Sequence, residues 1–255
     1  MYLNFKVQGS GQPVLLIHGL FGDLANLGGI ARALAEYYQV FQVDLPNHGQ
    51  SPHDSDVSYV NQSDAIVAFL NAQNISKVTV IGHSMGGKVA MALALRFPAL
   101  VEQLIVMDIA PVTYQKRMHD SVFQGLIATE STHLTSRKDA QDILAQHIDD
   151  PGVIQFLLKS FAKQDQGNFG FRFNINNLFN GYQEIMSWHL EGEYCGNTLF
   201  LKGGESPYIK AEHKEDIERL FPNAKAHVIS NTGHWLHAEK PDTVSRVIKR
   251  FLGNG

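Results

Sequence analysis

Cysteine is almost absent from this sequence, because Cys195 is the single one among 255 residues. No disulfide can therefore form within the chain. The paired-cysteine spacing of zinc sites is missing, and so are the His-Glu-x-x-His motif, the Walker loop and a Gly-x-Gly-x-x-Gly that follows a strand. We expect a cytoplasmic protein that needs neither a metal nor a cofactor.

Long hydrophobic runs and a strong charge of one sign are missing as well. No apolar run approaches the ~18–20 residues that span a bilayer. Residues 1–6 alternate instead of forming the apolar block of a signal peptide. The formal net charge is −4. Because nucleic acids and anionic membranes attract basic proteins, we expect neither as a partner, and no integral membrane contact.

The chain has enough apolar material for a packed core. Hydrophobic residues make up 44% of it and charged residues 18%, as in ordinary globular domains. A length of 255 residues suits one large α/β domain that carries an insertion.

The stretch from residue 78 to residue 95 is the one around which the rest is organised. Residues 78–81 are apolar and β-branched, as in a buried parallel strand, and the stretch ends in Ala, Leu and Met, which favour helix. Between the two parts, Gly82-x-Ser84-x-Gly86 matches the nucleophile elbow, in which a serine at a sharp strand-to-helix turn projects above the sheet. A plain strand-to-helix turn with a small residue at its tip is the alternative.

Strands and helices alternate along most of the chain. Strands are predicted at residues 14–17, 40–44, 78–81, 101–107, 197–202 and 224–229. Helices are predicted at residues 24–38 and 59–72, after the elbow, at 211–220 and from Pro241 onward. This alternation predicts a mostly parallel, doubly wound sheet with its functional groups at the carboxyl ends of the strands.

The alternation stops between residue 112 and about residue 190. No clear strand is predicted there, and amphipathic helices are expected at 118–129, 137–148 and 153–162. The segment is unusually rich in phenylalanine, and most of these rings are expected to form its own core. We expect a helical lid over the site. The predicted division is 1–111 for the first part of the α/β core, 112–190 for the lid and 191–255 for the second part.

A serine hydroxyl needs a base beside it, and His234 has the best position among the twelve histidines. It follows the last strand, at the end of the sheet where Ser84 is expected. His237 is close in sequence but is expected to pack at the turn into the final helix. His18 and His48 are expected to brace loops.

The histidine in turn needs an acceptor that fixes its tautomer. In most chains of this architecture the acid follows the penultimate strand, where this sequence has Glu205 and no aspartate. Asp108 ends a buried strand one position closer to Ser84. Because neighbouring strands are only ~4.8 Å apart, an acid moved by one strand still reaches the same histidine. We therefore predict Asp108 as the acid, with Glu205 as the alternative.

Backbone amides are predicted to hold the negative charge that develops on a substrate. The amide of Met85 lies at the start of a helix, where it faces such charge. The His18-Gly19 pair ends an earlier buried strand, and Gly19 lets the backbone turn so that the amide of Leu20 or Phe21 faces Met85. A simple strand-to-helix loop is the alternative there.

The chain resembles the α/β-hydrolases and, within them, small bacterial esterases. The shared motifs extend over nearly its whole length. They are His18-Gly19-Leu20-Phe21-Gly22, Asn47-His48-Gly49 with Ser51-Pro52, Gly82-His83-Ser84-Met85-Gly86-Gly87-Lys88, Asp108-Ile109-Ala110-Pro111, residues 152–161, Ser206-Pro207-Tyr208, Gly233-His234-Trp235 and residues 237–241. The resemblance implies ester hydrolysis through Ser84, Asp108 and His234, with short-chain esters and acyl-CoA thioesters as substrates. The missing aspartate near Glu205 departs from the wider family.

The expected function is that of a cofactor-independent serine esterase with a small-molecule ester or acyl thioester as substrate. The aromatic insertion predicts an apolar acyl pocket. Dehalogenases and epoxide hydrolases of this fold have aspartate where Ser84 stands and are disfavoured. A carbon–carbon bond hydrolase or a lyase remains an alternative, because the motif specifies the nucleophile and not the bond that breaks. A ligand-binding protein that kept the fold and lost turnover is another.

Overall fold

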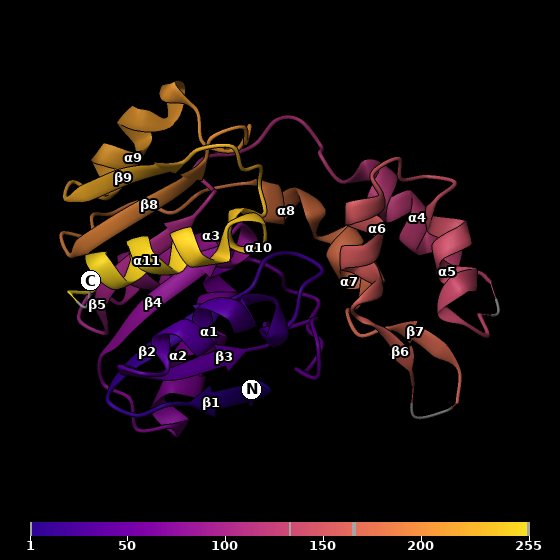
Figure 1. The fold of residues 1–255 in the computed structure, drawn as a ribbon, viewed down its shortest axis with the longest axis horizontal. Helices are drawn as coiled ribbons and strands as arrows, with labels where there is room; N and C mark the ends of the chain where they lie inside the picture. Colours follow the sequence, from indigo (N-terminus) through magenta and orange to yellow (C-terminus); the bar gives the residue numbers. More distant parts are fainter. Residues whose placement is uncertain (1, 133, 165–166, 254–255) are drawn as a thin grey trace.

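A seven-stranded sheet forms the centre of the computed structural model, which describes residues 2–132, 134–164 and 167–253 (Figure 1). The strand order is β1-β3-β2-β4-β5-β8-β9, and only β1 runs antiparallel to its neighbour. The strands are β1 Phe5–Gln8, β2 Gln12–Ile17, β3 Tyr38–Val43, β4 Val78–His83, β5 Val101–Met107, β8 Asn197–Gly203 and β9 Ala224–Ile229. The predicted mostly parallel α/β sheet is confirmed.

Helices cover both faces of this sheet, because successive side chains of each buried strand point to opposite sides. On β2, Leu15 and Ile17 belong to the larger apolar core, with helices α2 (Tyr59–Ala72) and α3 (Met85–Arg96). Val14 and Leu16 pack on the other face, with α1 (Gly28–Leu34) and α11 (Pro241–Phe251). The helices of the described residues include none with the length and apolar character needed to cross a bilayer.

Several predicted elements agree with the structure at both ends, among them the helix at 59–72 and the strands at 101–107 and 224–229. The helix predicted at 24–38 is wrong in extent. It is a 3-10 turn η1 (Leu24–Leu27) followed by α1, and β3 already begins at Tyr38. The two adjacent glycines that begin α1 favour helix poorly, so periodicity alone overestimated its length. The helix predicted at 211–220 likewise begins as a 3-10 turn, η2 (Ala211–His213), before α9 (Lys214–Leu220).

The segment between β5 and β8 lies beyond one end of the sheet, on the right in Figure 1. Its elements are α4 Asp120–Glu130, α5 Arg137–Leu144, α6 Pro151–Leu158, β6 Phe161–Lys163, β7 Phe169–Phe171, α7 Ile175–Asn180 and α8 Tyr182–Met186. Three expectations were wrong here. The helix predicted at 137–148 ends at Leu144, and the one predicted at 153–162 ends at Leu158. The segment also contains the antiparallel pair β6–β7. The ring of Phe161 packs on those of Phe169 and Phe171, with centroids 5.8 and 5.2 Å away, and such cross-strand aromatic pairs favour strand.

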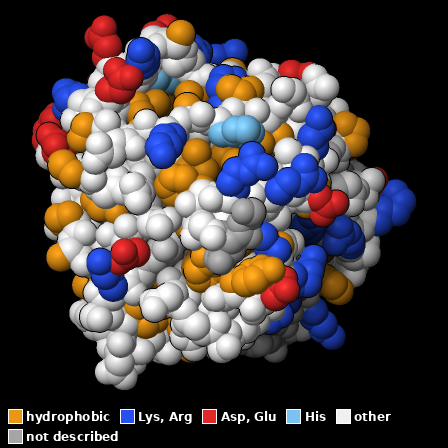
Figure 2. Space-filling model, turned by 60° about the vertical axis from the view of Figure 1, so that its left-hand side comes forward, with side chains coloured by type: hydrophobic (Ala, Val, Ile, Leu, Met, Phe, Trp, Pro, Cys, Tyr) orange, Lys and Arg blue, Asp and Glu red, His pale blue; other side chains and the backbone are white. Residues whose placement is uncertain are grey.

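The sheet edge formed by β9 is partly apolar, with 53% of Val228 exposed. Figure 2 shows the side of the molecule that lies on the left in Figure 1, and there exposed hydrophobic side chains stand among Lys and Arg side chains. Lys202, Lys210, Lys214 and Lys225 line a hollow of about 310 Å³ between β8, β9 and α9. Lysines beside an open edge oppose pairing with a strand from another chain.

One buried lysine ties both ends of the inserted segment to α3. Lys88 lies one turn after Ser84 and is 1% exposed. Its ammonium donates hydrogen bonds to the carbonyls of Val112 at 2.8 Å and of Met186 and Ser187 at 3.0 Å each. Burial lowers the pKa of Lys88 to about 7, while three carbonyl acceptors favour the charged form. These three hydrogen bonds, which we call the Lys88 clamp, therefore join the two points where the segment leaves and re-enters the sheet domain.

We expect Lys88→Met to lower the free energy of unfolding by about 3 kcal/mol, because three carbonyls lose a charged donor inside the protein. Chemical denaturation measures this loss. Amide hydrogen exchange should accelerate around residues 112 and 186, where the clamp acts, before it changes elsewhere.

The matched control is Lys138→Met in α5, whose side chain is 78% exposed and pairs with Asp142 at the surface. Such pairs contribute little, so stability should hardly change. Equal stability of the two variants would contradict the role given to Lys88.

Candidate active site

Ser84 occupies a strained turn between β4 and α3. Its φ of 54° and ψ of −123° lie outside the regions that ordinary residues favour. The flanking glycines allow this turn. A Cβ atom on Gly82 would collide with the carbonyl oxygen of Gly86, and one on Gly86 would collide with the carbonyl oxygens of Ile17 and His18. The Gly-x-Ser-x-Gly spacing thus follows from the close approach of backbone on both sides of Ser84.

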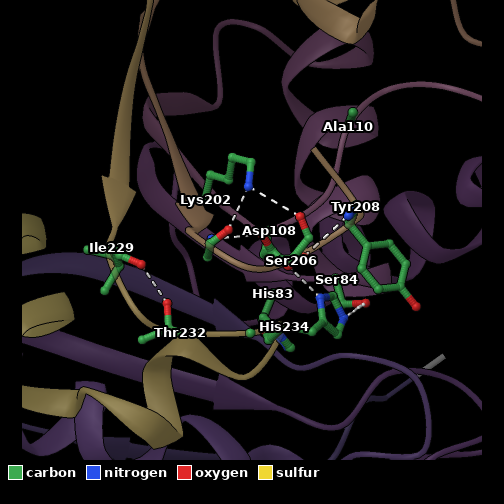
Figure 3. A network of polar contacts seen from close by, with 12 residues as sticks. His83, Ser84, Asp108, Ala110, Lys202, Ser206, Tyr208, Ile229, Thr232 and His234 are labelled. Carbon is green, nitrogen blue, oxygen red and sulfur yellow. Dashed lines mark hydrogen bonds and ion pairs between the residues drawn. The ribbon is translucent and has the colours of Figure 1, made fainter. Parts of the chain in front are cut away.

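The structure brings Ser84, His234 and Asp108 together in one hydrogen-bonded chain (Figure 3). Nε2 of His234 lies 2.8 Å from the hydroxyl of Ser84, and Nδ1 lies 2.7 Å from Oδ2 of Asp108. A carboxylate can only accept, so Nδ1 carries the proton and Nε2 accepts from the serine. The Asp108 side chain is fully buried and that of His234 is 19% exposed. The arrangement positions Nε2 of His234 to take the serine proton.

The turn after β8 holds the carboxylate of Asp108. The amide of Gly203 donates to Oδ1 at 2.9 Å, and the hydroxyl of Ser206 donates to Oδ2. Nζ of Lys202 binds the carbonyls of Gly203 and Ser206 at 2.7 and 3.2 Å and so stiffens the turn (Figure 3). Glu205, the alternative acid, is exposed on the same turn. The turn after β8 therefore supplies no acid to His234; its Ser206 instead binds the carboxylate of Asp108, which follows the neighbouring strand β5.

The amides proposed for the negative charge differ in what they already bind. The amide of Phe21 donates to Nε2 of His48 at 3.2 Å. Within residues 2–132, 134–164 and 167–253, the amides of Leu20 and Met85 donate to no other group. Of the two alternatives named from the sequence, the hydrogen bonds therefore favour Leu20, whose amide is free to bind a substrate together with that of Met85.

His18 and His48 brace the loops beside the site, as expected. His18 binds the carbonyl of Gly19 through Nδ1 at 2.8 Å and accepts from the amide of Leu45 through Nε2 at 3.1 Å. His48 binds the carbonyl of Pro46 at 2.9 Å through Nδ1. Burial lowers the pKa of His18, and it lowers that of His48 to about 3. Both rings are therefore neutral supports.

Two further histidines lie beside His234. His83 donates from Nε2 to the backbone carbonyl of His234 at 2.8 Å, and its ring centroid lies 4.3 Å from that of His237. Burial lowers the pKa of His83, and it lowers that of His237 to about 4. His237, on the short helix α10 (Leu236–Glu239), therefore packs as expected. The support from His83 was not predicted, because the middle position of the motif carries no signal for it.

Ser84 lines a cavity of about 680 Å³ between the carboxyl end of the sheet and the inserted segment. His234 lines this cavity, and so do Val122 and Phe156 from the insertion. Among the residues that the structure describes, no group of three His, Cys, Asp or Glu side chains could hold a metal ion.

Comparison with known proteins gives consistent matches over the whole chain. Residues 12–241 match the family model described as alpha/beta hydrolase fold. The chain is 49% identical over 241 residues to a putative esterase/lipase of Haemophilus influenzae, covering 94% of this chain and 83% of the relative. It is 43% identical over 259 residues to esterase YbfF of Escherichia coli, covering 100% of each. A solved structure of a marine microorganism esterase is 35% identical with a TM-score of 0.95, covering 98% of this chain and 99% of that one.

We expect Gly86→Ala to lower the free energy of unfolding by at least about 2 kcal/mol, because the added Cβ has backbone on both sides and cannot be accommodated without a shift. Gly29→Ala is the control: this residue is exposed on α1, and no atom lies within 4 Å of the added Cβ. The free energy of unfolding of Gly29→Ala should equal that of the wild type or exceed it by up to about 1 kcal/mol. If the denaturation curves of the two variants coincided, the close backbone packing described around Gly86 would be contradicted.

Proposed function

The chain belongs to the α/β-hydrolase family, and from this premise we propose that it is a serine esterase, which hydrolyses carboxylic esters through an acyl-enzyme intermediate. The observation that carries the proposal is the chain of hydrogen bonds from Asp108 through His234 to Ser84, at 2.7 and 2.8 Å. Two relatives, of which the chain covers 83% and 100%, are named as a putative esterase/lipase and as an esterase.

In the first half of the reaction, Oγ of Ser84 attacks the acyl carbon while its proton passes to Nε2 of His234. The carbonyl electron pair moves onto oxygen, and the amides of Leu20 and Met85 hold this oxyanion. Asp108 keeps the imidazolium oriented and balances its charge. When the carbonyl re-forms, the ester bond breaks, and the leaving oxygen takes the proton from His234. The alcohol departs and the acyl group stays on Ser84.

In the second half, water attacks the acyl-enzyme and gives its proton to His234. Collapse of the second oxyanion breaks the bond to Ser84, whose oxygen recovers the proton from His234, and the acid departs. A thioester follows the same steps with a thiol as the leaving group. We include acyl thioesters in the proposed substrate class on this chemical ground.

The test is hydrolysis of p-nitrophenyl acetate by the wild type and by three variants. Ser84→Ala should lower turnover by about 10⁶-fold, and Asp108→Asn by about 10⁴-fold, the losses typical of such triads. Glu205→Gln is the matched control, because it also removes one carboxylate near β8, from an exposed side chain. Its turnover should be that of the wild type.

Each outcome decides between the alternatives. Loss of turnover in Glu205→Gln with activity kept in Asp108→Asn would move the acid to Glu205. A wild type that hydrolyses no ester would refute the esterase proposal and would favour a carbon–carbon hydrolase, a lyase or a ligand-binding protein.

A further inference from the structure

Ser84 lies where two cavities of very different size meet. The cavity of about 680 Å³ described above is called the outer cavity. The second measures about 40 Å³ and is called the inner cavity, because Met85 and Lys88 of the helix that begins at Ser84 line it. Both are lined by Leu20, Ser84, Met118, His119 and Tyr208, so a substrate bound at Ser84 reaches into both. The two parts of an ester therefore have unequal space.

The position of His234 decides which part of the ester enters which cavity. The leaving group must receive a proton from Nε2 of His234, so its first atom has to lie beside that nitrogen. His234 lines the outer cavity but not the inner one. Met85, whose backbone amide is proposed to bind the oxyanion, lines only the inner cavity. We propose that the inner cavity holds the acyl group and the outer cavity the leaving group. This assignment rests on the proposed esterase function.

The size of the inner cavity limits the acyl group. A water-sized group needs about 10–15 Å³ of such space, so about 40 Å³ takes about three non-hydrogen atoms. The acyl group that fits has two to four carbons, by this order-of-magnitude count of space. The preferred substrate is therefore an ester or thioester of a short acid with a large alcohol or thiol.

Hydrogen bonds fix the part of the inner cavity's wall that is formed by Tyr59, Lys88 and Tyr182. The hydroxyl of Tyr59 donates to the carbonyl of Ile185, and that of Tyr182 lies 2.7 Å from Nδ1 of His119. All three protons of the Lys88 ammonium are used by carbonyls. A longer acyl chain that displaced these side chains would have to break their hydrogen bonds. On this side the inner cavity does not expand around a longer chain; its other wall includes the exposed side chains of Lys116 and Met118.

The outer cavity suits a large leaving group with an apolar body. Val122, Val153 and Leu157 line it, and the rings of Phe156 and Trp235 pack together there with centroids 5.6 Å apart. Its charged residues are of both signs, Asp150, Lys159 and Glu239. The lining thus favours apolar bulk and shows no preference for a leaving group of one charge.

Octyl acetate and ethyl octanoate test the assignment directly. They are isomers, both release a primary alkyl alcohol, and they differ only in which side of the ester carries the long chain. Release of acid by the wild-type protein should give a kcat/KM at least about 100-fold higher for octyl acetate, since each methylene that does not fit a pocket changes the rate by about 10–200-fold.

Hydrolysis of p-nitrophenyl acetate, measured in parallel with Ser84→Ala as the blank, separates this inference from the proposed function. If that ester is hydrolysed but ethyl octanoate equals or exceeds octyl acetate, or neither isomer is a substrate, the assignment of the cavities is overturned and the esterase stands. If no ester is hydrolysed, both fall.

A variant that enlarges the inner cavity gives an independent test. Ile185→Ala removes three carbons from its wall, and the preference for octyl acetate over ethyl octanoate should shrink by about tenfold or more. Val60→Ala is the control, because this residue is exposed on α2 and lines neither cavity. Its preference should match the wild type. An unchanged preference in Ile185→Ala would overturn the placement of the acyl group.

Discussion

The buried carboxylate of Asp108 is the constraint on which the arrangement of the site depends. A fully buried carboxylate is strongly unfavourable unless hydrogen bonds compensate for lost water. Here three donors do so, the amide of Gly203, the hydroxyl of Ser206 and Nδ1–H of His234. They come from the turn after β8 and the loop after β9. Satisfying one charge therefore fixes two loops relative to β5, and with them the imidazole that faces Ser84.

Backbone strain is concentrated at the same edge of the sheet. Three residues that follow β2, β4 and β5 have positive φ although none is glycine: Phe21 at 62°, Ser84 at 54° and Asp108 at 54°. Each such residue costs roughly 1–3 kcal/mol and persists only where its surroundings enforce it. The surroundings do so through the backbone amides, which donate to Nε2 of His48 for Phe21, to the carbonyl of Met107 for Ser84 and to that of Leu201 for Asp108. The parallel sheet is thus the rigid body that sustains the strain, and its burial on both faces supplies the needed stability.

Features that depend on residues close together in the sequence could be predicted from it, and those that depend on residues far apart mostly could not. The elbow around Ser84 is a local pattern, so its spacing carried the information, and the alternation of strands and helices carried the sheet. The position of Asp108 beside His234 was predictable because no aspartate follows the penultimate strand, so another acid had to reach His234. The roles of Lys88 and Ser206 were not, since their partners are carbonyls and a carboxylate distant in sequence. The β6–β7 pair was missed because its strands are three residues each, too short for a periodic signal.

The clamp at Lys88 gives the unequal cavities a structural cause. Lys88 lies on the helix that begins at Ser84 and holds both attachments of the inserted segment, so the nearby inner wall and Ser84 belong to one rigid unit. On the side of the insertion, the outer cavity is lined by residues of α4 and α6. No residue of α6 lines the inner cavity, whereas α4 follows directly on His119, which binds Tyr182 in the inner wall. Sequence changes in α6 therefore reshape the outer cavity without replacing a residue of the inner wall. Under the proposed assignment of the cavities, the choice of acyl group is tied to the helix that begins at Ser84, while changes in α6 alter the choice of leaving group independently.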